Sequence, residues 1–463
     1  MTNPQPLRFS AFVMHTASHI QHGLWRHPDA RQADFEDVSL WIDLARTLEA
    51  GGFDAIFFAD VVGVYGGAGA SYEINAREGL QLPAHDPSVL LSALAVHTEH
   101  LGLAFTSSTL QAHPFEFARR VSTLDHISRG RIGWNIVTSH LENAARNFGH
   151  ERLLDHDERY AQAQEYLDVV YKLWEGSWDD GALLKGRVPG APASDRSGPY
   201  ADHTRIHRID HHGRWYDVEG PHLVSPSPQR TPLLFQAGAS PAGAAFAARN
   251  AEASFILAPD RDRARELIAN TKRLAVEAGR SADDIAFYQG ITFIVGSTEE
   301  EARRKEAEID EYLSADAFFV HSNLGTDQRT GKPIPPDTPL KDIPTQGGQG
   351  QLQWLRQLSP GREPTVADLA RLSAKLRGRI VGTPESIADE LEGWRDAGVA
   401  GINVMNWMIP TSYEEFADHV MPVLRRRGLA ADGYTEGTLR RKLTGRDTLP
   451  ETHPAARYRG AFA

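Results

Sequence analysis

The chain has 463 residues, a formal net charge of −12 and no cysteine. The missing cysteine excludes disulfides, thiolate nucleophiles, iron–sulfur ligation and cysteine-ligated zinc. The acidic balance disfavours nucleic acid and anionic membranes as partners. No signal peptide is visible and no stretch approaches the ~20 apolar residues of a membrane span, so we expect a cytoplasmic protein without membrane contact.

Strand-like and helix-like segments alternate along most of the chain. Apolar runs predict strands at 7–14, 54–60, 102–109, 131–137, 232–238, 253–259, 285–296 and 402–407. Amphipathic patterns predict a helix after each strand, with expected N-caps at Asp34, Asp155 (in a capping box with Glu158), Ser297 and Thr383. Eight strands, each paired with a helix, predict a (β/α)₈ TIM barrel.

The length exceeds that of an ordinary barrel. A barrel of roughly 250 residues leaves about 200 for insertions and a tail. We expect one domain over 1–463, with insertions over the C-terminal face at about 178–228 and 312–378 and a C-terminal tail at about 424–463. The first insertion should contain a hairpin around Gly213. The alternative, a doubly wound open sheet, lacks a Gly-x-Gly-x-x-Gly after its first strand.

Polar residues stand where the predicted strands end, and in a barrel these ends carry the site. They are Asp60, Thr106 to Thr109, Asn135, Ser139 and Gly238 to Ser240. Strand alternation points Asn135 and Ser139 into the barrel, where Asn135 is either a ligand contact or a satisfied core amide. His156 and Tyr160 lie four apart on one helix face, as ligand contacts or as ordinary helix residues.

The segment QAGAS before Pro241 places free backbone N–H groups at a helix start, which favours an anion there. Ordinary capping by Ser240 explains the same residues without a ligand. The 20 histidines form neither His-Glu-x-x-His nor His-x-His, so no metal site is expected. Gly-x-Ser-x-Gly is also absent, and the glycine-rich stretch 63–69 has no Lys-Ser/Thr, which disfavours a serine hydrolase and a phosphate loop.

Longer motifs extend over nearly the whole chain. They are GLWRHP (23–28), FFADV (57–61), HPFEFARRVSTLDHISRGRIGWNIVTS (113–139), AARNFG (144–149), HDERY (156–160), RIDHHGRWYDVEGP (208–221), QAGAS (236–240) and IVGTPESIADEL (380–391). The chain thereby resembles the bacterial-luciferase-like, FMN-dependent two-component monooxygenases. It is most similar to the subgroup of nitrilotriacetate monooxygenase component A, EDTA monooxygenase, dibenzothiophene sulfone monooxygenase and the large subunit of pristinamycin IIA synthase.

The resemblance implies a (β/α)₈ fold and a two-component reaction. A separate NAD(P)H:FMN reductase would deliver FMNH₂, which would combine with O₂ into a C4a-hydroperoxyflavin and oxygenate a small organic substrate. Aminopolycarboxylates, organosulfur compounds and alkyl chains are all compatible with the resemblance. It also implies a homodimer or a dimer of dimers. The alternatives are an F420-dependent oxidoreductase of the same fold and a non-catalytic flavin-binding subunit.

The resemblance also assigns residues. Expected FMN contacts from the resemblance are Asp60, Ser108, Ser139, His156, Tyr160 and Ser240, with Tyr160 and Ser240 at the phosphate. Asn135 and Gly238, at the strand ends, are also expected to contact the cofactor. Ser139 and His19 are the expected catalytic residues. Phe57, Phe246 and His321 are expected to line the substrate pocket with His19. A lid should cover this pocket and include the segment 328–342, which is longer here than in the family pattern.

Overall fold

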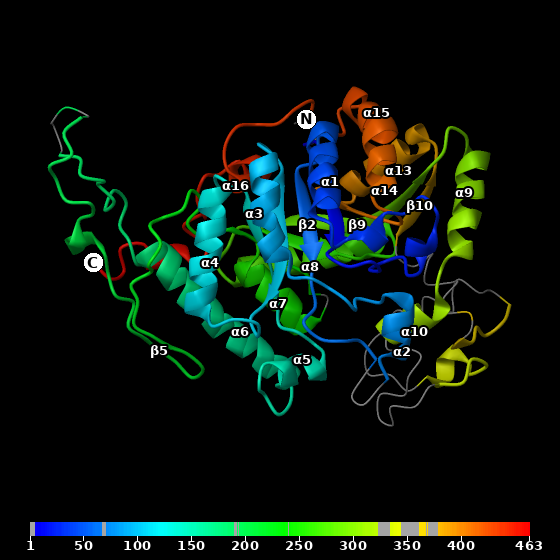
Figure 1. Cartoon of the computed structure of the whole chain (residues 1–463), viewed down its shortest axis with the longest axis horizontal. Coiled ribbons are helices and arrows are strands. Elements are labelled where there is room, and N and C mark those ends of the chain that lie inside the picture. Colours follow the sequence, from blue (N-terminus) through cyan, green and yellow to red (C-terminus); the bar gives the residue numbers. More distant parts are fainter. Residues whose placement is uncertain are drawn as a thin grey trace.

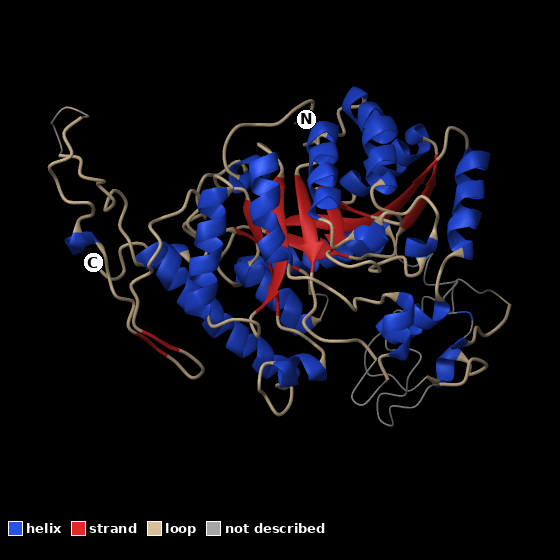
Figure 2. Ribbon diagram, viewed as in Figure 1, coloured by secondary structure: helices blue, strands red, loops and turns tan. Residues whose placement is uncertain are grey.

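Eight parallel strands close into a barrel at the centre of the molecule (Figure 2). The computed structural model describes residues 5–66, 71–188, 192, 194–238, 240–322, 334–343, 361–366, 368 and 378–463. The barrel strands, in spatial order, are β1 (Arg8–Met14), β2 (Ala55–Ala59), β3 (Gly102–Ser108), β4 (Ile132–Val137), β7 (Leu233–Gln236), β8 (Ala253–Ile256), β9 (Ala286–Val295) and β11 (Gly401–Met405). Parallel pairing of β8 with β9, β9 with β11 and β11 with β1 closes the ring. The predicted (β/α)₈ barrel is confirmed.

Helices surround these strands (Figure 1). The longer ones are α1 (Val38–Gly51), α3 (Pro87–His97), α4 (Pro114–Ile127), α6 (His156–Tyr171), α7 (Pro241–Asn250), α8 (Arg261–Glu277), α9 (Glu299–Glu311) and α13 (Pro384–Asp396). The shorter ones are α2 (Glu73–Glu78), α5 (Glu142–Asn147), α10 (Ala315–Ser322), α14 (Thr411–Glu415), α15 (Met421–Arg426) and α16 (Leu439–Thr444). None of the helices in the described ranges has both the length and the apolar character that crossing a bilayer requires.

Strand alternation divides the apolar residues into two layers. Trp134 and Ile136 of β4 point outward and belong to the large cluster between strands and helices. Phe57, Phe235 and Tyr288 point inward and fill the barrel with other side chains. The predicted sidedness of β4 is therefore confirmed, because a period of two places alternate side chains on opposite faces of a strand.

The predicted helix starts are right at Thr383 and Asp155 and wrong at Asp34 and Ser297. The Thr383 hydroxyl accepts the N–H of Ser386, as expected. Asp37 rather than Asp34 caps α1, and Thr298 rather than Ser297 caps α9. The capping box at α6 does not form, because the Asp155 carboxylate accepts from Arg152 and caps no N–H. At α1 and α9 a second polar residue nearby takes the capping position.

One strand was missed. β10 (Arg379–Gly382) pairs with the last four residues of β9, from Thr292 to Val295. The first part of β9 pairs with β8 and β11, so the ten-residue strand has three parallel partners. Four residues directly before a strong helix start carry too little periodicity to be recognised as a strand.

The structure describes most of the first insertion and only parts of the second. The first contains the predicted hairpin, β5 (His211–His212) with β6 (Asp217–Val218), while the chain before it, from Trp178, extends sideways from the barrel (Figure 1). Of the second insertion, 323–333, 344–360, 367 and 369–377 lie outside the described residues. The expected lid at 328–342 is therefore described only from 334 onward, as an irregular segment with one short helical turn at Leu340–Asp342.

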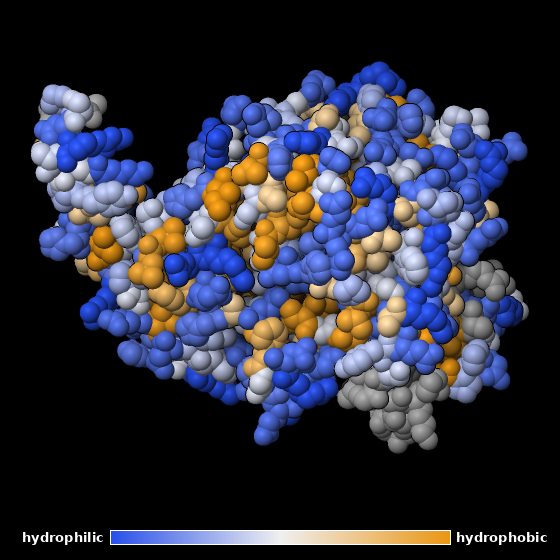
Figure 3. All heavy atoms as spheres, viewed as in Figure 1, coloured by the Kyte–Doolittle hydropathy of each residue, from blue (hydrophilic) through white to orange (hydrophobic). Residues whose placement is uncertain are grey.

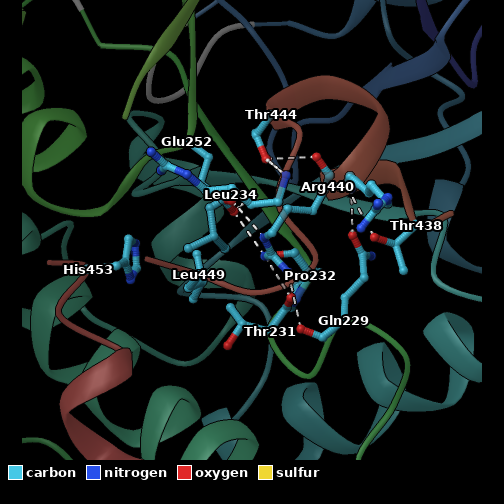
Figure 4. A network of polar contacts seen from close by, with 12 residues as sticks. Gln229, Thr231, Pro232, Leu234, Glu252, Thr438, Arg440, Thr444, Leu449 and His453 are labelled. Carbon is cyan, nitrogen blue, oxygen red and sulfur yellow. Dashed lines mark hydrogen bonds and ion pairs between the residues drawn. The ribbon is translucent and has the colours of Figure 1, made fainter. Parts of the chain in front are cut away.

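The C-terminal tail closes the N-terminal end of the barrel. Arg440 of α16 is fully buried and forms an ion pair with Glu252, with Nε–Oε1 at 2.7 Å (Figure 4). Its other guanidinium N–H groups donate to the carbonyls of Gln229, Thr231 and Pro232, in the loop that leads into β7. Leu439 next to it inserts into the interior cluster of the barrel. The tail is thus part of the core.

Two buried histidines should make the fold sensitive to acid. Burial lowers the pKa of His453 to about 3 and that of His222 to about 4. His453 Nδ1 accepts the Ala455 N–H and Nε2 lies 2.8 Å from the Asn250 carbonyl, which together fit the neutral ring. The unfolded chain binds these protons near pH 6.5, so stability should be full above that pH. It should fall by about 1.4 kcal/mol per pH unit per histidine as the pH drops toward 4.

Urea unfolding at a series of pH values measures this slope. The variant His453→Asn should flatten the slope below pH 6.5, because asparagine can donate and accept without titrating. Exposed His212 provides the matched control, and His212→Asn should leave the slope unchanged. An unaltered slope in His453→Asn would show that this ring is not protonated on unfolding.

Candidate functional site

The C-terminal ends of β2, β3, β4 and β7 open onto a cavity of about 280 Å³. This is close to the lower end of the range of about 300–1,000 Å³ typical of ligand sites. Six of the predicted site residues line it: Asp60, Ser108, Ser139, His156, Tyr160 and Phe246. They come from three strands and two helices, so closure of the barrel brings together residues that are far apart in the sequence.

A chain of hydrogen bonds joins the strand ends. Ser139 Oγ donates to Ser108 Oγ at 2.8 Å, and the Gln111 amide oxygen accepts from Ser107 Oγ at 2.9 Å and from the Ser108 N–H at 2.5 Å. The Gln111 amide nitrogen in turn donates to Asp60 Oδ2 at 3.2 Å. The network therefore spans β2, β3 and β4. Gln111 was not predicted, because it lies three residues beyond the end of its strand.

Two properties of this network are typical of functional sites. Ser139 has a φ of 57°, in the left-handed region that a serine adopts only at a cost of about 1–3 kcal/mol. Burial raises the pKa of Asp60 to about 7, against the opposing effect of the Gln111 hydrogen bond. A carboxyl group poised near neutrality in a cavity can exchange a proton with a ligand or hydrogen-bond to it in either state.

A second group of residues converges on the first turn of α7. The Ser240 hydroxyl accepts the Gly243 N–H at 3.1 Å and so caps the helix. A Cβ placed on Gly243 would lie 2.8 Å from the Tyr160 hydroxyl and 3.1 Å from Ser240 Oγ. Two hydroxyls therefore flank the positive end of the helix dipole. Arg159, which was not predicted, lines the same cavity and adds a full positive charge.

Gly238 and two buried amides, Gln236 and Asn135, belong to β7, the loop after it and β4. A Cβ on Gly238 would lie 2.5 Å from the Gln236 amide nitrogen, so Gln236 needs the glycine beside it. Gln236 lines the cavity and its amide oxygen is buried without a hydrogen-bond partner among the described residues. Asn135 lies inside the barrel, donating to Thr106 Oγ1 at 2.9 Å, and its amide oxygen is likewise without a described partner. Neither Asn135, Gly238 nor Ser240 is part of the cavity lining.

The other predicted pocket residues lie away from this lining. Phe57 is inside the barrel, in contact with the rings of Phe12 and Phe235. The His19 ring packs on Phe12 with 5.2 Å between centroids. His321 of α10 contacts the Tyr65 ring at 4.5 Å, and Tyr65 itself lines the cavity. The structure thus brings His321 to the rim and places Phe57 and His19 around Phe12.

Histidines form a network at this rim. His22 lies 3.1 Å from Ser18 Oγ and 2.8 Å from His321 Nδ1. On its far side His321 lies 3.5 Å from the Gln81 amide nitrogen, and the Tyr65 ring also contacts His140. Among the described residues, no group of three or more metal-ligating side chains has a geometry for a metal ion. Of these residues only His321 was predicted, because the others stand on loops after strand ends, where sequence periodicity gives no signal.

Fold and site together define a class: a TIM-barrel enzyme with a polar ligand cavity at the C-terminal face of its strands. A family model described as luciferase-like monooxygenase matches residues 14–401. The chain belongs to this family, and it is therefore a flavin-dependent monooxygenase.

Relatives match over almost the whole length. The chain is 40% identical to a long-chain alkane monooxygenase of Geobacillus thermodenitrificans, over 98% of each sequence. It is 41% identical to a dimethyl-sulfide monooxygenase of Hyphomicrobium sulfonivorans, over 98% of this chain and 94% of that protein. The crystal structure of a riboflavin lyase with modified FMN and riboflavin superposes with a TM-score of 0.88 at 35% identity, covering 98% and 100% of the two chains. The resemblance predicted from the motifs is confirmed, and its subgroup members are among the relatives.

Proposed function

We propose that the chain binds reduced FMN, supplied by a separate NAD(P)H:FMN reductase, and uses it with O₂ to oxygenate a small organic molecule. Bound FMNH₂ supplies the electrons that activate O₂. The observation that carries the proposal is the division of the cavity into two ends. One end has Arg159 and the Tyr160 hydroxyl, with Ser240 and the start of α7 next to that hydroxyl, and the other has a hydrogen-bonded polar network.

The first end fits a phosphate. Arg159 supplies charge, Tyr160 and Ser240 supply hydroxyl donors, and α7 presents backbone N–H groups. Charged hydrogen bonds and a helix N-terminus are the groups that hold phosphates in proteins. This fit favours FMN over riboflavin, which has no phosphate.

The second end fits a flavin ring system. A ring with several nitrogen and carbonyl groups would find complementary partners in the Asp60 carboxyl, the Ser139 hydroxyl and the Gln236 amide oxygen. The buried amide oxygen of Gln236 lacks a described donor, and a ring N–H would satisfy it. Val61, Val62 and Phe246 add apolar walls that exclude water from the reacting atoms.

The charge of the cavity favours a substrate without several negative charges. Arg159 is the single arginine or lysine in the described lining, and the proposal assigns it to the phosphate. An aminopolycarboxylate would require further cations, whereas a thioether or a hydrocarbon would not. Relatives at about 40% identity are named for a long-chain alkane and for dimethyl sulfide. We therefore assign an uncharged organosulfur or alkyl substrate.

Turnover with ¹⁸O₂ tests this function. The purified chain, an NAD(P)H:FMN reductase, FMN and dimethyl sulfide or an alkane should give product carrying one ¹⁸O, with no product when the reductase is omitted. Nitrilotriacetate should not be converted. Replacing FMN with F420 should abolish both binding and turnover. Conversion of nitrilotriacetate would contradict the substrate class, and binding of F420 in preference to FMN would contradict the cofactor.

We also propose that the chain forms a homodimer through the face of α1 and α3. Val89 and Val96 of α3 lie seven residues apart and are 73% and 70% exposed, and Val38 of α1 is 46% exposed. Figure 3 shows hydrophobic surface where these helices lie in the same view. Clustered exposed valines are typical of an interaction surface.

Light scattering should give twice the chain mass of 51.1 kDa for the dimer. The double variant Val89→Lys with Val96→Lys should give the mass of one chain, because burying two ammonium groups in an interface is unfavourable. Val276→Lys, at an exposed valine of α8, is the matched control and should leave the dimer intact. A dimer that survives the double variant would exclude this face.

A further inference from the structure

A second, smaller cavity lies beside the cofactor cavity. Its volume is about 120 Å³, and its walls come from the loop after β3, from α5 and the segment 150–154, from α6 and from the β5–β6 hairpin. Thr138 and Arg159 line both cavities. The Arg159 side chain therefore stands in the wall between them, and the function proposed above does not use the second cavity.

The body of this cavity is apolar and its walls are held in place. Leu110, Leu153, Leu154 and the Trp215 indole contribute the apolar surface. The Glu165 carboxylate accepts the Trp215 N–H at 3.0 Å, and the Arg214 guanidinium lies 4.4 Å from the centroid of the indole ring. An aromatic wall fixed at its backbone suits a ring or a branched chain.

The polar groups in this cavity are basic. His150, Arg152 and Arg159 are among its lining residues, and no carboxylate lines it in the part of the chain that the structure describes. Two carboxylates lie nearby: Glu142 accepts the Leu153 N–H, and Asp155, at the surface, pairs with Arg152 itself. Arg159 Nη1 donates to the Leu154 carbonyl at 2.7 Å, while its buried Nε donates to no described residue. Arg159 thus contributes a positive charge to the wall of this cavity.

We propose that this cavity is a second binding site, for a small monocarboxylate with an aromatic or branched apolar body. The carboxylate would pair with Arg159 and Arg152, and the body would pack on Leu153 and Trp215. A cavity of about 120 Å³ is far too small for a flavin and restricts the ligand to about one ring, for which benzoate serves as the probe. A carboxylate is favoured over a neutral ligand because a buried cationic donor gains most from an ionised partner.

A carboxylate in this cavity should also affect FMN binding, an expectation that rests on the function proposed above. A carboxylate in the second cavity and the FMN phosphate in the first would draw on the same guanidinium. Each ligand should therefore weaken the other, and linkage requires the two factors to be equal. A carboxylate of this class would act as a negative effector of flavin binding without entering the cofactor cavity.

Calorimetric titration of the whole, flavin-free chain with benzoate tests the site, with benzyl alcohol and inorganic phosphate as probes that lack the charge or the apolar body. We expect saturable binding of one benzoate per chain and weaker binding of benzyl alcohol, whereas inorganic phosphate should bind in the first cavity and be displaced by FMN. Arg152→Met should raise the Kd of benzoate at least fivefold and leave the affinity for FMN unchanged. Ser240→Ala should weaken FMN binding and leave the affinity for benzoate unchanged. The two variants therefore distinguish a failure of the second site from a failure of the cofactor site. Arg146→Met, at an exposed arginine of α5, should change neither affinity.

The same titration at saturating FMN tests the coupling. We expect the Kd of benzoate to rise about fivefold or more and to remain measurable. Three results would overturn the proposal: no saturable benzoate binding at millimolar concentration, equal binding of benzyl alcohol, or complete exclusion of benzoate by FMN, which would mean that the two cavities are one. Circular dichroism of each variant verifies that it is folded, and Arg152 is at the surface, where its replacement leaves the core intact.

Discussion

Replacing Arg440 with methionine should lower the free energy of unfolding by about 3–5 kcal/mol, the usual cost of leaving one partner of a buried ion pair uncompensated. In Arg440→Met the Glu252 carboxylate, 4% exposed, keeps its charge and loses two hydrogen bonds. The carbonyls of Gln229, Thr231 and Pro232 lose their donors as well. Urea unfolding followed by circular dichroism measures the change.

Two controls separate the buried charge from the loss of a side chain. Arg441 follows Arg440 in α16, is half exposed and pairs with Asp447 at the surface, so Arg441→Met should change stability by at most about 0.5 kcal/mol. The double variant Arg440→Met with Glu252→Gln should recover part of the loss, because a neutral amide is less costly to bury than a charge. Equal stability of Arg440→Met and Arg441→Met would show that the tail does not secure the barrel.

Replacing Arg159 with methionine should weaken FMN binding by about 10- to 150-fold, corresponding to a hydrogen bond between charged groups of about 1.5–3 kcal/mol. Tyr160→Phe and Ser240→Ala should each weaken it by roughly two- to tenfold, since each removes one hydroxyl. Flavin fluorescence quenching measures these affinities. The physical reason is the phosphate charge, which only Arg159 matches among the arginines and lysines of the described lining.

Riboflavin provides the decisive comparison, because it has the ring system and lacks the phosphate. Its affinity should be the same for the native chain and for Arg159→Met. Arg146→Met removes the same charge from exposed α5 and should not alter either affinity. If Arg159→Met weakened riboflavin as much as FMN, the arginine would act on the ring end or on folding, and the phosphate would lie elsewhere.

The barrel was predictable because each strand and helix has a local signal. Strand alternation placed Trp134 outward and Asn135 inward, and both are so in the structure. The strand ends identified Asp60, Ser108 and Ser139, which all line the cavity. The sidedness of a strand and the position of its end are predictable because the side-chain period and the end of an apolar run are properties of a few neighbouring residues.

The unpredicted site residues have no such signal. Gln111 and Tyr65 follow strand ends on loops, and Gln81 reaches His321 across 240 residues of sequence. The sequence shows no sign that Arg159 belongs to the site, since a charged residue on a helix ordinarily faces water. Which of these side chains meet depends on how loops fold over the closed barrel.

The sequence by itself determined the eight strands, the sidedness of β4, the family and the polar strand ends, because local periodicity and long motifs carry that information. The tertiary structure decided what those residues do together. Barrel closure joined Asp60, Gln111, Ser108 and Ser139 into one network, and helix packing brought Tyr160 to Ser240 at the start of α7. The tail is part of the core because Arg440 pairs with Glu252, which lies 188 residues away in the sequence. Contacts of this kind are fixed by the packing of the whole chain, and no short stretch of sequence contains them.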